Sequence, residues 1–428
     1  MPVLFSTGTL LLLVLGVPVF LVLLLPVLAT LGTTTATPPV LVIQRMFSGI
    51  DKFPLMAIPF FIAAGNIMAE GGISRRLIRL ARAIVSPVPG GLAVTTVMSS
   101  MFFGAISGSS PATVIAVGRI MLPSLETAGY SRPFSIGLLM SAGSLGNIIP
   151  PSIFMIVYGA VTGVSIGALF LAGIGAGIVY GAVFILICVL YAESRGLART
   201  RGWDLCEIWL ALRDSIWGLM TPLIILGGIY GGFFTPTEAA AIAVAYAIFV
   251  TMAVHREMSF RQLLACTVSS GVTTAQVMII ISAASAFSWF LATSGLSQAV
   301  GEILSLLGDN PIWVLLAINA IVVAAGMILD PISLVIILVP FISPVAEVAG
   351  IDPLLLGIVM AVNASIGMFS PPFGLNLFIS TGLGVSYREA ILGALPFMAV
   401  GLFALMIVSY IPVLTIWLPS LFYSGVSF

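Results

Sequence analysis

Long apolar runs separated by short polar stretches leave this chain few possible folds. Each run is long enough to cross a bilayer as a helix, which takes about 20 residues. Two further runs, 89–125 and 312–346, are too long for one span and contain Gly, Pro and Ser near their centres. The sequence therefore predicts an all-α polytopic membrane protein. The single-span runs lie at 8–32, 54–70, 134–160, 164–192, 215–233, 237–254, 268–293, 354–379 and 390–418.

The scarcity of charge excludes other classes of protein. Asp, Glu, Lys and Arg make up 7% of the 428 residues, whereas a soluble domain devotes about a quarter to them, so a water-soluble enzyme is excluded. A net charge of zero with one His also excludes a nucleic-acid partner, because phosphate binding requires a basic surface. Cys188, Cys206 and Cys266 are far apart and predict neither a disulfide framework nor a cysteine metal site.

The chain contains two similar halves, divided by a polar connector at 193–214 that carries eight charges. Ser144–Pro151 matches Ser365–Pro372 at an offset of 221 residues, where two apolar runs are interrupted. An internal repeat is therefore expected. Three smaller matches lie upstream at nearly the same offset: Gly72-Ile-Ser74 with Gly295-Leu-Ser297, Pro89 with Pro311, and Gly104 with Gly326.

The charges beside the two long runs predict that the halves are inverted. Arginines at 75–82 and 132 flank the first run, whereas the second has acids alone: Glu302, Asp309, Glu347 and Asp352. Because cytoplasmic loops are rich in Lys and Arg, the first flanks are cytoplasmic and the second are outside. Each long run then enters and leaves on one side, as a re-entrant helical hairpin. Inverted repeats of this kind are typical of secondary transporters.

The tip of the first hairpin, Gly104–Thr113, is a candidate binding site. Breaking a helix in hydrocarbon frees backbone polar groups, which is tolerated only where protein or a wet cavity satisfies them. Carbonyls and the hydroxyls of Ser107, Ser109 and Ser110 are hard oxygen ligands for a small cation. The N-terminus of the returning half-helix attracts an anion. Close packing of small residues is the alternative interpretation.

The tip of the second hairpin, Gly326–Ser333, contains Asp330, an acid in the middle of an apolar run. An ionisable group at that depth costs a few kcal/mol or more and marks a functional site by default. Asp330 followed by Pro331 also fits the N-cap of the returning half-helix. The two roles are compatible.

Two spans are predicted to be broken, at Gly146–Ser152 and Gly367–Pro372, each with a double proline. Asn147, Asn363 and Asn376 lie close to these breaks and can both donate and accept hydrogen bonds. Simple proline kinks are the alternative. A double proline repeated at a constant offset favours paired functional breaks.

These segments resemble the large membrane subunit of TRAP (tripartite ATP-independent periplasmic) transporters. The resemblance covers essentially the whole chain, and its motifs are numerous and long. They are Gln44–Gly49, Pro59–Ile62 leading to Gly65, Gly104–Thr113, Gly146–Ser152, Gly231–Ala240 and Gly326–Pro331.

The resemblance implies a prokaryotic inner-membrane system in three parts. A periplasmic binding protein delivers a small organic anion, usually a carboxylate such as a C4-dicarboxylate, sialic acid or a keto acid. This large subunit carries the anion inward with Na⁺ as coupling ion, needs no other cofactor and is not an enzyme. A small four-helix membrane subunit acts as scaffold. Because the chain starts at the family's first large-subunit span, that subunit is expected to be a separate polypeptide.

The resemblance also implies where the cargo binds. One Na⁺ site would draw on Ser107, Ser109, Ser110, Gly146 and Pro150, and the other on Gly326, Asp330, Gly367 and Ser370, many through backbone carbonyls. The substrate would lie near Ser107, Asn147, Pro150, Asn363 and Asn376. The segment with Arg45 and Lys52 breaks the charge rule by lying outside, where Arg45 would face the binding protein.

The family moves its hairpins as an elevator against a fixed scaffold, which gives an expected division of this chain. Scaffold spans and a cytoplasmic arm helix occupy 1–88, and scaffold spans with amphipathic connectors occupy 161–311. The two halves of the transport domain, each a hairpin with a broken helix, occupy 89–160 and 312–379, and a last scaffold span follows at 380–428.

Three other functions are weighed against this one. A stand-alone divalent-anion/Na⁺ symporter shares paired hairpins but needs no binding protein. An intramembrane enzyme would need a nucleophile–base or metal pair within the spans, and the sequence offers none, since its one His lies in a loop. A passive channel would not need inverted hairpins.

Overall fold

The fold is all-helical in a computed structural model, which describes residues 8–9, 11–12, 15–34, 38–197, 202–294 and 310–422. Within these ranges the chain forms helices joined by turns and short loops, as the apolar runs predict. Glu302, Asp309 and the repeat match at 295–297 lie outside the described residues, so that part of the sequence argument is untested.

The described helices range from 4 to 35 residues in length. The first half contains α2 (Val19–Thr34), α3 (Val40–Ile50), η1 (Phe53–Met56), α4 (Ala57–Glu70), α5 (Ile73–Val85), α6 (Gly91–Ser107), α7 (Ser110–Thr127), α8 (Arg132–Gly143), η2 (Ser144–Asn147), α9 (Ile153–Thr162) and α10 (Ile166–Ser194). The second contains α11 (Leu205–Tyr230), α12 (Pro236–Ile248), η3 (Phe249–Val254), α13 (Phe260–Ser294), α15 (Pro311–Gly326), α16 (Pro331–Val348), α17 (Pro353–Gly367), α18 (Leu375–Thr381), α19 (Tyr387–Tyr410) and α20 (Val413–Phe422).

Several helices are long and apolar enough to cross a membrane. Seven such helices lie in the described part of the chain, among them α10, α13 and α19. α13 has 35 residues and is therefore about 52 Å long, well beyond the bilayer core of about 30 Å. The hairpins and breaks account for most of the shorter apolar helices. The chain is a multi-pass membrane protein, as the sequence predicts.

Both predicted hairpins are present. α6 and α7 meet at a tip formed by Gly108 and Ser109, and α15 and α16 meet at a tip formed by residues 327–330. Both tips fall where glycine and polar residues interrupt a long apolar run. Proline is the first or second residue of both returning helices, where its missing N–H costs nothing.

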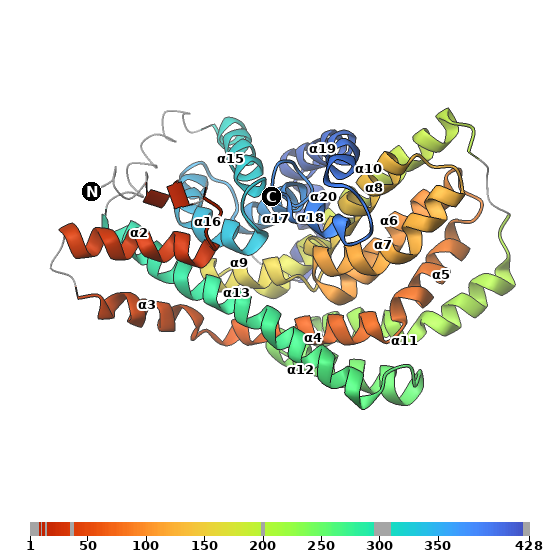
Figure 1. The fold of residues 1–428 in the computed structure, drawn as a ribbon, viewed down its shortest axis with the longest axis horizontal. Helices are drawn as coiled ribbons and strands as arrows, with labels where there is room; N and C mark the ends of the chain where they lie inside the picture. Colours follow the sequence, from red (N-terminus) through yellow and green to blue (C-terminus); the bar gives the residue numbers. More distant parts are fainter. Residues whose placement is uncertain are drawn as a thin grey trace.

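Both predicted broken spans are present as well. Residues 148–152 separate α9 from α8 and its η2 extension, and residues 368–374 separate α17 from α18. The double prolines lie inside these breaks, and each forms a cis peptide bond. The two halves of the chain therefore repeat one architecture of hairpin and broken helix (Figure 1).

The bases of the two hairpins lie at opposite ends of α19. At one end, Arg132, which follows the first hairpin, pairs with Glu126 of α7 at 2.9 Å and with Glu389 of α19 at 3.3 Å. At the other end, the hydroxyl of Tyr410 donates to the carbonyl of Ile312, at the start of α15, at 3.1 Å. α19 has 24 residues and is about 36 Å long. The hairpins therefore enter from opposite faces, which confirms the inverted repeats.

The arm helix α5 is amphipathic. Leu77 and Leu80 are buried, whereas Arg75, Arg79 and Arg82 are exposed. Side chains three or four apart share a helix face, so the arginines point away from the apolar side. The apolar side packs on α6 and α11, and the basic side is left for water and acidic partners.

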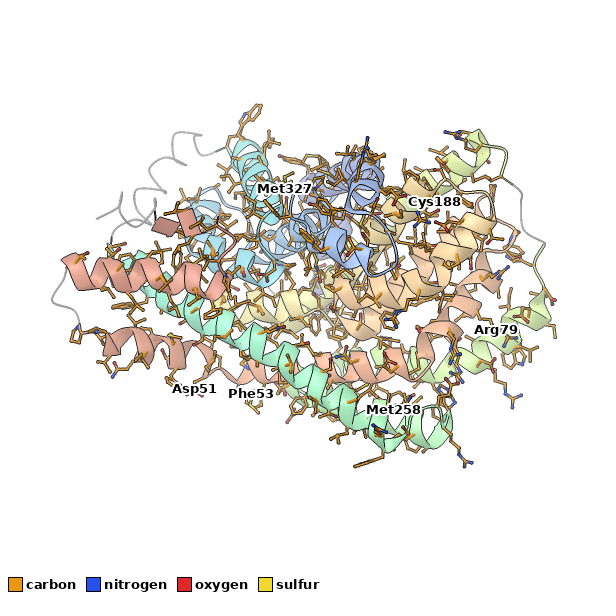
Figure 2. The ribbon with its side chains drawn as sticks, viewed as in Figure 1. Asp51, Phe53, Arg79, Cys188, Met258 and Met327 are labelled. Carbon is orange, nitrogen blue, oxygen red and sulfur yellow. The ribbon has the colours of Figure 1, made fainter. Side chains whose placement is uncertain are left out.

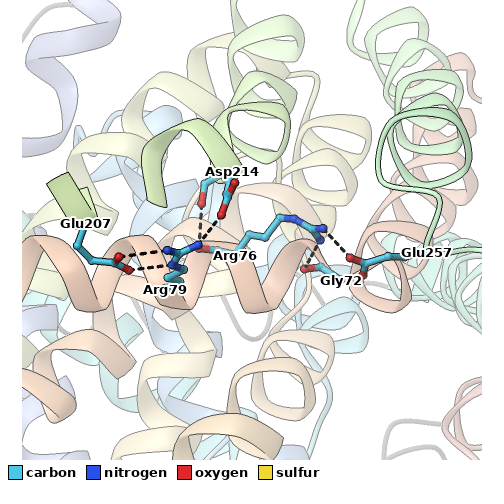
Figure 3. Close-up of polar contacts among 7 residues, drawn as sticks. Gly72, Arg76, Arg79, Glu207, Asp214 and Glu257 are labelled. Carbon is cyan, nitrogen blue, oxygen red and sulfur yellow. Dashed lines mark hydrogen bonds and ion pairs between the residues drawn. The ribbon is translucent and has the colours of Figure 1, made fainter. Parts of the chain in front are cut away.

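Ion pairs tie α5 to two neighbouring segments (Figure 3). Arg76 pairs with Glu257, in the turn before α13, at 2.5 Å. Arg79 pairs with Glu207 at 2.8 Å and with Asp214 at 2.5 Å, both near the start of α11. These contacts gather the basic arm and two interhelical connections at one end of the molecule, the cytoplasmic end under the positive-inside rule.

The segment with Arg45 and Lys52 lies away from that end. Its neighbour Asp51 and Arg79 lie toward opposite ends of the long axis (Figure 2). Lys52 donates to the carbonyl of Ala160, in the last turn of α9, at 2.8 Å. This places Lys52 beyond the far end of the first broken helix, on the outer side in the charge scheme.

The helices form a hairpin unit and a layer beside it. The hairpin unit consists of the two hairpins and the two broken helices, and it packs with α10, α19 and α20. The layer consists of α2, α3, α4, α12 and α13, which lie along one side of the unit (Figure 1). The unit and the layer meet where α13 contacts α16 and where α4 contacts α6 and α7. α10 and α19, which the sequence assigns to scaffold, pack on the hairpin unit, on α6 and α8 respectively.

Candidate functional site

One cavity lies where the two hairpin tips and the two breaks meet. Its volume is about 460 Å³, and α4 and α13 close it on the side of the layer. A partly polar cavity of this size suits a small-molecule ligand. The lining residues with polar side chains are Asn66, Ser107, Ser109, Asn147, Ser269, Thr273, Gln276 and Asp330.

Gly108 shapes the first tip. Its φ of +59° ends α6 in the left-handed region, and Ser109 follows in an extended conformation before α7 begins. A Cβ on Gly108 would lie 2.4 Å from the carbonyl oxygen of Pro151, so only glycine fits this turn. The carbonyl of Gly108 also accepts from the N–H of Ile153 at 3.4 Å. The first tip therefore rests directly on the unwound backbone of the first broken helix.

Oxygen atoms gather within one turn of this tip. The hydroxyl of Thr113 donates to the carbonyl of Ser109 at 2.8 Å and lies 3.1 Å from the hydroxyl oxygen of Ser107. Gly146, in the first break, approaches the same carbonyl so closely that a Cβ on it would lie 2.7 Å from that oxygen. Carbonyl and hydroxyl oxygens are the ligands that hard cations prefer.

Two asparagines hold the first tip from both broken helices. The backbone N–H of Ser110 donates to Oδ1 of Asn147 at 3.3 Å. Nδ2 of Asn376 donates to the hydroxyl oxygen of Ser110 at 2.9 Å and to the carbonyl of Met140 at 3.0 Å. Because Asn376 belongs to the second half of the chain, this contact joins the two repeats.

Asp330 organises the second tip. One carboxylate oxygen accepts from the N–H groups of Ile332 at 3.0 Å and Ser333 at 3.2 Å, and the other accepts from the hydroxyl of Ser333. These bonds confirm the predicted N-cap, with Pro331 as the first residue of α16. Asp330 also lines the cavity and is partly exposed to it. Capping therefore leaves the carboxylate available to a ligand.

The second tip contacts its own break as the first tip does. The N–H of Phe373 donates to the carbonyl of Met327 at 3.1 Å. Gly326 and Gly367 touch through their backbones, since a Cβ on Gly367 would lie 2.6 Å from the Gly326 carbonyl oxygen. Gly104 and Gly146 form the equivalent contact in the first half, where a Cβ on Gly104 would lie 3.0 Å from Gly146 Cα.

The residues predicted to surround the substrate divide into two groups. Ser107 and Asn147 line the cavity, whereas Pro150, Asn363 and Asn376 do not. Asn376 reaches the site indirectly, by holding Ser110. Asn363 is fully buried and turns toward α15, where its Nδ2 donates to Oδ1 of Asn319 at 2.8 Å.

The residues predicted to hold Na⁺ fall into two clusters, one at each tip. In the first, Ser109 lies against both Ser107 and Gly146, and Ser110 and Pro150 extend the cluster into α7 and the first break. In the second, the structure brings Gly326 and Gly367 into contact behind Asp330, while the hydroxyl of Ser370 donates to the carbonyl of Ile366 at 2.7 Å.

The sequence did not predict that residues of the layer form one wall of the cavity. Ser269, Thr273 and Gln276 of α13 and Asn66 of α4 line the cavity opposite the tips. Their spacing on α13 follows the helical repeat, so all three share one face. A polar stripe inside an otherwise apolar run was the signal that could have identified them. Asn66 and α13 are also joined directly, by Nδ2 donating to the hydroxyl of Ser270 at 2.9 Å.

Arg45 lies on α3, outside the cavity. Its side chain is exposed, and the guanidinium carbon lies 5.6 Å from the ring centroid of Trp289 on α13. An exposed cation–π contact of this kind contributes about 0.5–1 kcal/mol. Part of the guanidinium remains open to a partner.

Inverted repeats, two re-entrant hairpins and a shared cavity between their tips define a transport protein of the secondary-transporter type. Residues 7–414 match the family described as the tripartite ATP-independent periplasmic transporter, DctM component. The chain therefore belongs to the DctM family of TRAP transporter large membrane subunits, as the motifs indicated. Such subunits work with a small membrane subunit and a periplasmic binding protein.

Two relatives agree with this assignment, and a solved structure shares the fold. The chain is 41% identical to the C4-dicarboxylate TRAP transporter large permease protein DctM of Pseudomonas aeruginosa over 378 residues, 88% of each chain. It is 38% identical to the ectoine TRAP transporter large permease protein TeaC of Halomonas elongata, over 89% of each chain. The YdaH transporter of Alcanivorax borkumensis shares the fold, with a TM-score of 0.63, 17% identity, and coverage of 96% of this chain and 99% of that one.

Proposed function

We propose that this chain carries a small organic anion, a carboxylate, inward across the cytoplasmic membrane together with Na⁺. The observation that supports this most strongly is the cavity of about 460 Å³ between two opposed hairpin tips. Both tips carry oxygen atoms that can serve as ligands, and both broken helices reach the same space. A site closed by two elements that enter from opposite faces can be opened to one side at a time, which is the requirement for alternating access.

Na⁺ would bind at each tip. At the first tip the proposed ligands are the oxygens of Ser107, Ser109, Ser110, Gly146 and Pro150, and at the second those of Gly326, Asp330, Gly367 and Ser370. The glycine contacts support this, because they let unwound backbone from two elements approach within ligand distance of one small ion. Two bound cations would also offset the charge of a carboxylate and couple its uptake to the ion gradient and membrane potential.

The anion would lie between the tips, against Ser107 and Asn147 on one side and the polar stripe of α13 on the other. The relatives that are permeases for C4-dicarboxylates and for ectoine support a small carboxylate-bearing cargo without deciding which one. In this proposal Pro150, Asn363 and Asn376 shape the site from behind. Arg45 would face the binding protein, since its segment lies toward the outer end.

Movement of the hairpin unit as an elevator is part of the same proposal. The unit meets the layer of α4 and α13 through the cavity wall, so sliding one past the other would carry the site across the membrane. A small membrane subunit and a periplasmic binding protein would complete the system. The stand-alone divalent-anion/Na⁺ symporter is the alternative, and it differs in needing no binding protein.

Uptake into proteoliposomes tests the proposal. The large subunit with its small subunit is reconstituted, and radiolabelled succinate is added outside with the cognate binding protein and an inward Na⁺ gradient. We expect concentrative uptake that requires both Na⁺ and binding protein. Uptake that persists without the binding protein would favour the alternative. If a ligand screen on the binding protein selects another carboxylate, the same assay is run with that compound.

A further inference from the structure

One exposed stripe of α7 leaves the cavity in the direction of the cytoplasmic end. Pro111 and Ile115 line the cavity, and Pro123 and Thr127 line a second hollow of about 420 Å³ at the base of the first hairpin. Residues four apart on a helix are neighbours, and Ile115, Arg119, Pro123 and Thr127 are all exposed. Arg119 therefore lies on the line that joins the cavity to the hollow, between Ile115 and Pro123.

Arg119 is a charged residue in the middle of α7. It is eight residues before the end of α7 and nine after its start, so it lies about 12 Å along the axis from the cytoplasmic end. Its side chain is exposed, and it makes no ion pair or hydrogen bond in the described ranges. Arginine at such depth is costly, and as a rule it faces a water-filled path or a partner.

A second unpaired arginine stands where the stripe ends. Arg82 of α5 lines the hollow with Pro123 and Thr127, and it also lines an adjoining hollow of about 440 Å³ along α5. Its neighbours Arg76 and Arg79 are held by acids, whereas Arg82 has no such contact among the residues that the structure describes. Positive charge is therefore uncompensated at two successive points below the cavity.

The stripe faces the junction between the hairpin unit and the layer. α7 contacts both α4 and α5, and the polar cavity residues Asn66 and Ser269 lie near the cytoplasmic ends of α4 and α13. The cavity thus extends toward the same end as the stripe. An anion that leaves the cavity along α7 meets Arg119 first and Arg82 next.

We propose that the stripe Ile115–Arg119–Pro123–Thr127 is the cytoplasmic exit path of the transported anion, and that Arg119 binds the anion transiently as it leaves. This inference rests on the proposed function, because it takes the cargo to be an organic anion. The competing role for Arg119 is to reach the phosphate of a membrane lipid. The two differ in whether the guanidinium of Arg119 shares an aqueous path with Ile115 of the cavity wall.

Cysteine modification measures that difference without requiring transport. Ile115→Cys is introduced after Cys188, Cys206 and Cys266 have been replaced by Ser, and the complex is placed in inside-out vesicles. The rates of reaction with an anionic and a cationic methanethiosulfonate are compared. We expect modification from the cytoplasmic side, with the anionic reagent favoured. Adding Arg119→Gln should lower the anionic-to-cationic rate ratio about three- to tenfold, from Coulomb's law across one helical turn.

Two control variants test whether the effect is specific to the charge at position 119. Arg119→Lys should preserve the ratio. Arg213→Gln, which removes an exposed arginine of α11 that has no ion pair among the residues described, should leave it unchanged. Should Arg119→Gln not insert in the membrane, raising the salt concentration tests the same charge, since screening lowers the ratio toward one. A cysteine at 115 that resists both reagents overturns the proposal in favour of lipid contact. A ratio unaffected by Arg119 and by salt also overturns it.

The transport assay adds an independent arm. With succinate as probe, Arg119→Gln should slow uptake several-fold while Arg119→Lys and Arg213→Gln retain the wild-type rate. If wild-type protein shows no Na⁺-driven uptake but the rate ratio still depends on Arg119, the proposed function fails and the positive aqueous path stands. If uptake is normal and the ratio does not respond, the exit path fails alone.

Discussion

The two hairpin tips share a backbone plan but differ in how their polar groups are used. At the first tip, Ser110 is held by Asn147 of one broken helix and Asn376 of the other, which lies 266 residues away. At the second tip, Asp330 makes its hydrogen bonds within its own helix, to Ile332 and Ser333. The first tip is therefore fixed across the repeat by neutral groups, whereas the side chain of Asp330, among the described residues, bonds only within α16 and carries a charge.

This difference shows that the repeat conserves shape more than chemistry. Each half needs glycine contacts between hairpin and break, and both have them. The asymmetry lies in the side chains: hydroxyls and amides at one tip, a carboxylate at the other. Four predictions test the comparison.

Removing the charge at the second tip should have the largest effect. Asp330→Asn keeps a good capping residue but removes the carboxylate, and it is expected to reduce Na⁺-dependent uptake to background while leaving expression intact. Asp352→Asn is the matched control, because Asp352 also caps a helix that begins with proline and lies outside the cavity. Equal uptake in the two variants would mean that Asp330 acts only as a helix N-cap and that its charge is not needed for transport.

Closing the glycine contacts should have a large effect at both tips alike. In Gly146→Ala and Gly367→Ala the new methyl groups meet backbone oxygen atoms at 2.7 Å and 2.6 Å, which cannot be relieved by a side-chain rotation. Overpacking of this kind costs about 1–3 kcal/mol of unfolding free energy, and the displaced backbone should also abolish uptake. Thermal unfolding in detergent measures the first effect and proteoliposome flux the second.

Gly227→Ala provides the reference for that pair. Gly227 lies in α11, and no atom lies within 4 Å of the position that its Cβ would occupy. Alanine is the better helix former by about 1 kcal/mol, so this variant should be as stable as the wild type or more so. If Gly146→Ala were as stable as Gly227→Ala, Gly146 would not lie this close to the carbonyl of Ser109 at the first tip.

Removing one member of the cross-repeat bond should have a moderate effect. Ser110→Ala removes one hydrogen-bond partner of the buried Asn376 amide, which should lower the free energy of unfolding by about 1–3 kcal/mol. Ser99→Ala, in the same hairpin, should be neutral, because the buried Ser99 hydroxyl has no hydrogen-bond partner in the described part of the chain. Equal unfolding temperatures for the two variants would mean that Asn376 does not hold the first tip.

The ion pairs of the arm helix should contribute least. The hydrogen bond from Arg76 lowers the pKa of Glu257 below its ordinary value of 4.5. Its stabilising contribution is therefore present at neutral pH and is lost as the pH falls below that value. Partial exposure limits it to less than about 1 kcal/mol. Glu257→Gln should abolish this part of the acid dependence of the unfolding temperature; an unchanged acid profile would exclude the contribution.

The sequence predicted those parts of the fold that depend on local breaks. Apolar runs are interrupted by the double prolines, by the glycines at 104 and 326, and by Asp330 followed by Pro331. Such interruptions free backbone polar groups, which is costly in hydrocarbon unless protein or a wet cavity satisfies them. The double prolines and the two glycines recur at a nearly constant offset of 221 or 222 residues. This repetition, with arginines near one hairpin and acids near the other, was enough to predict inverted hairpins.

The rotation of each helix about its axis, which sets the direction of its side chains, could not be predicted from these local breaks. Asn363 and Asn376 both lie near the second break, yet one turns toward Asn319 of α15 and the other toward Ser110 of the first tip. Their directions depend on packing between helices that are far apart in sequence. The wall supplied by α13 could have been found, since Ser269, Thr273 and Gln276 follow the helical repeat.

The central claim is that the two unlike tips each close a cation site on one transport cavity. Equilibrium binding of ²²Na⁺ to the purified complex tests it most directly. The account predicts one Na⁺ per tip: Asp330→Asn should remove one of the two bound ions, and Ser107→Ala with Gly146→Ala should remove the other. Na⁺ binding that is unchanged in all these variants, with the proteins folded, would contradict the claim.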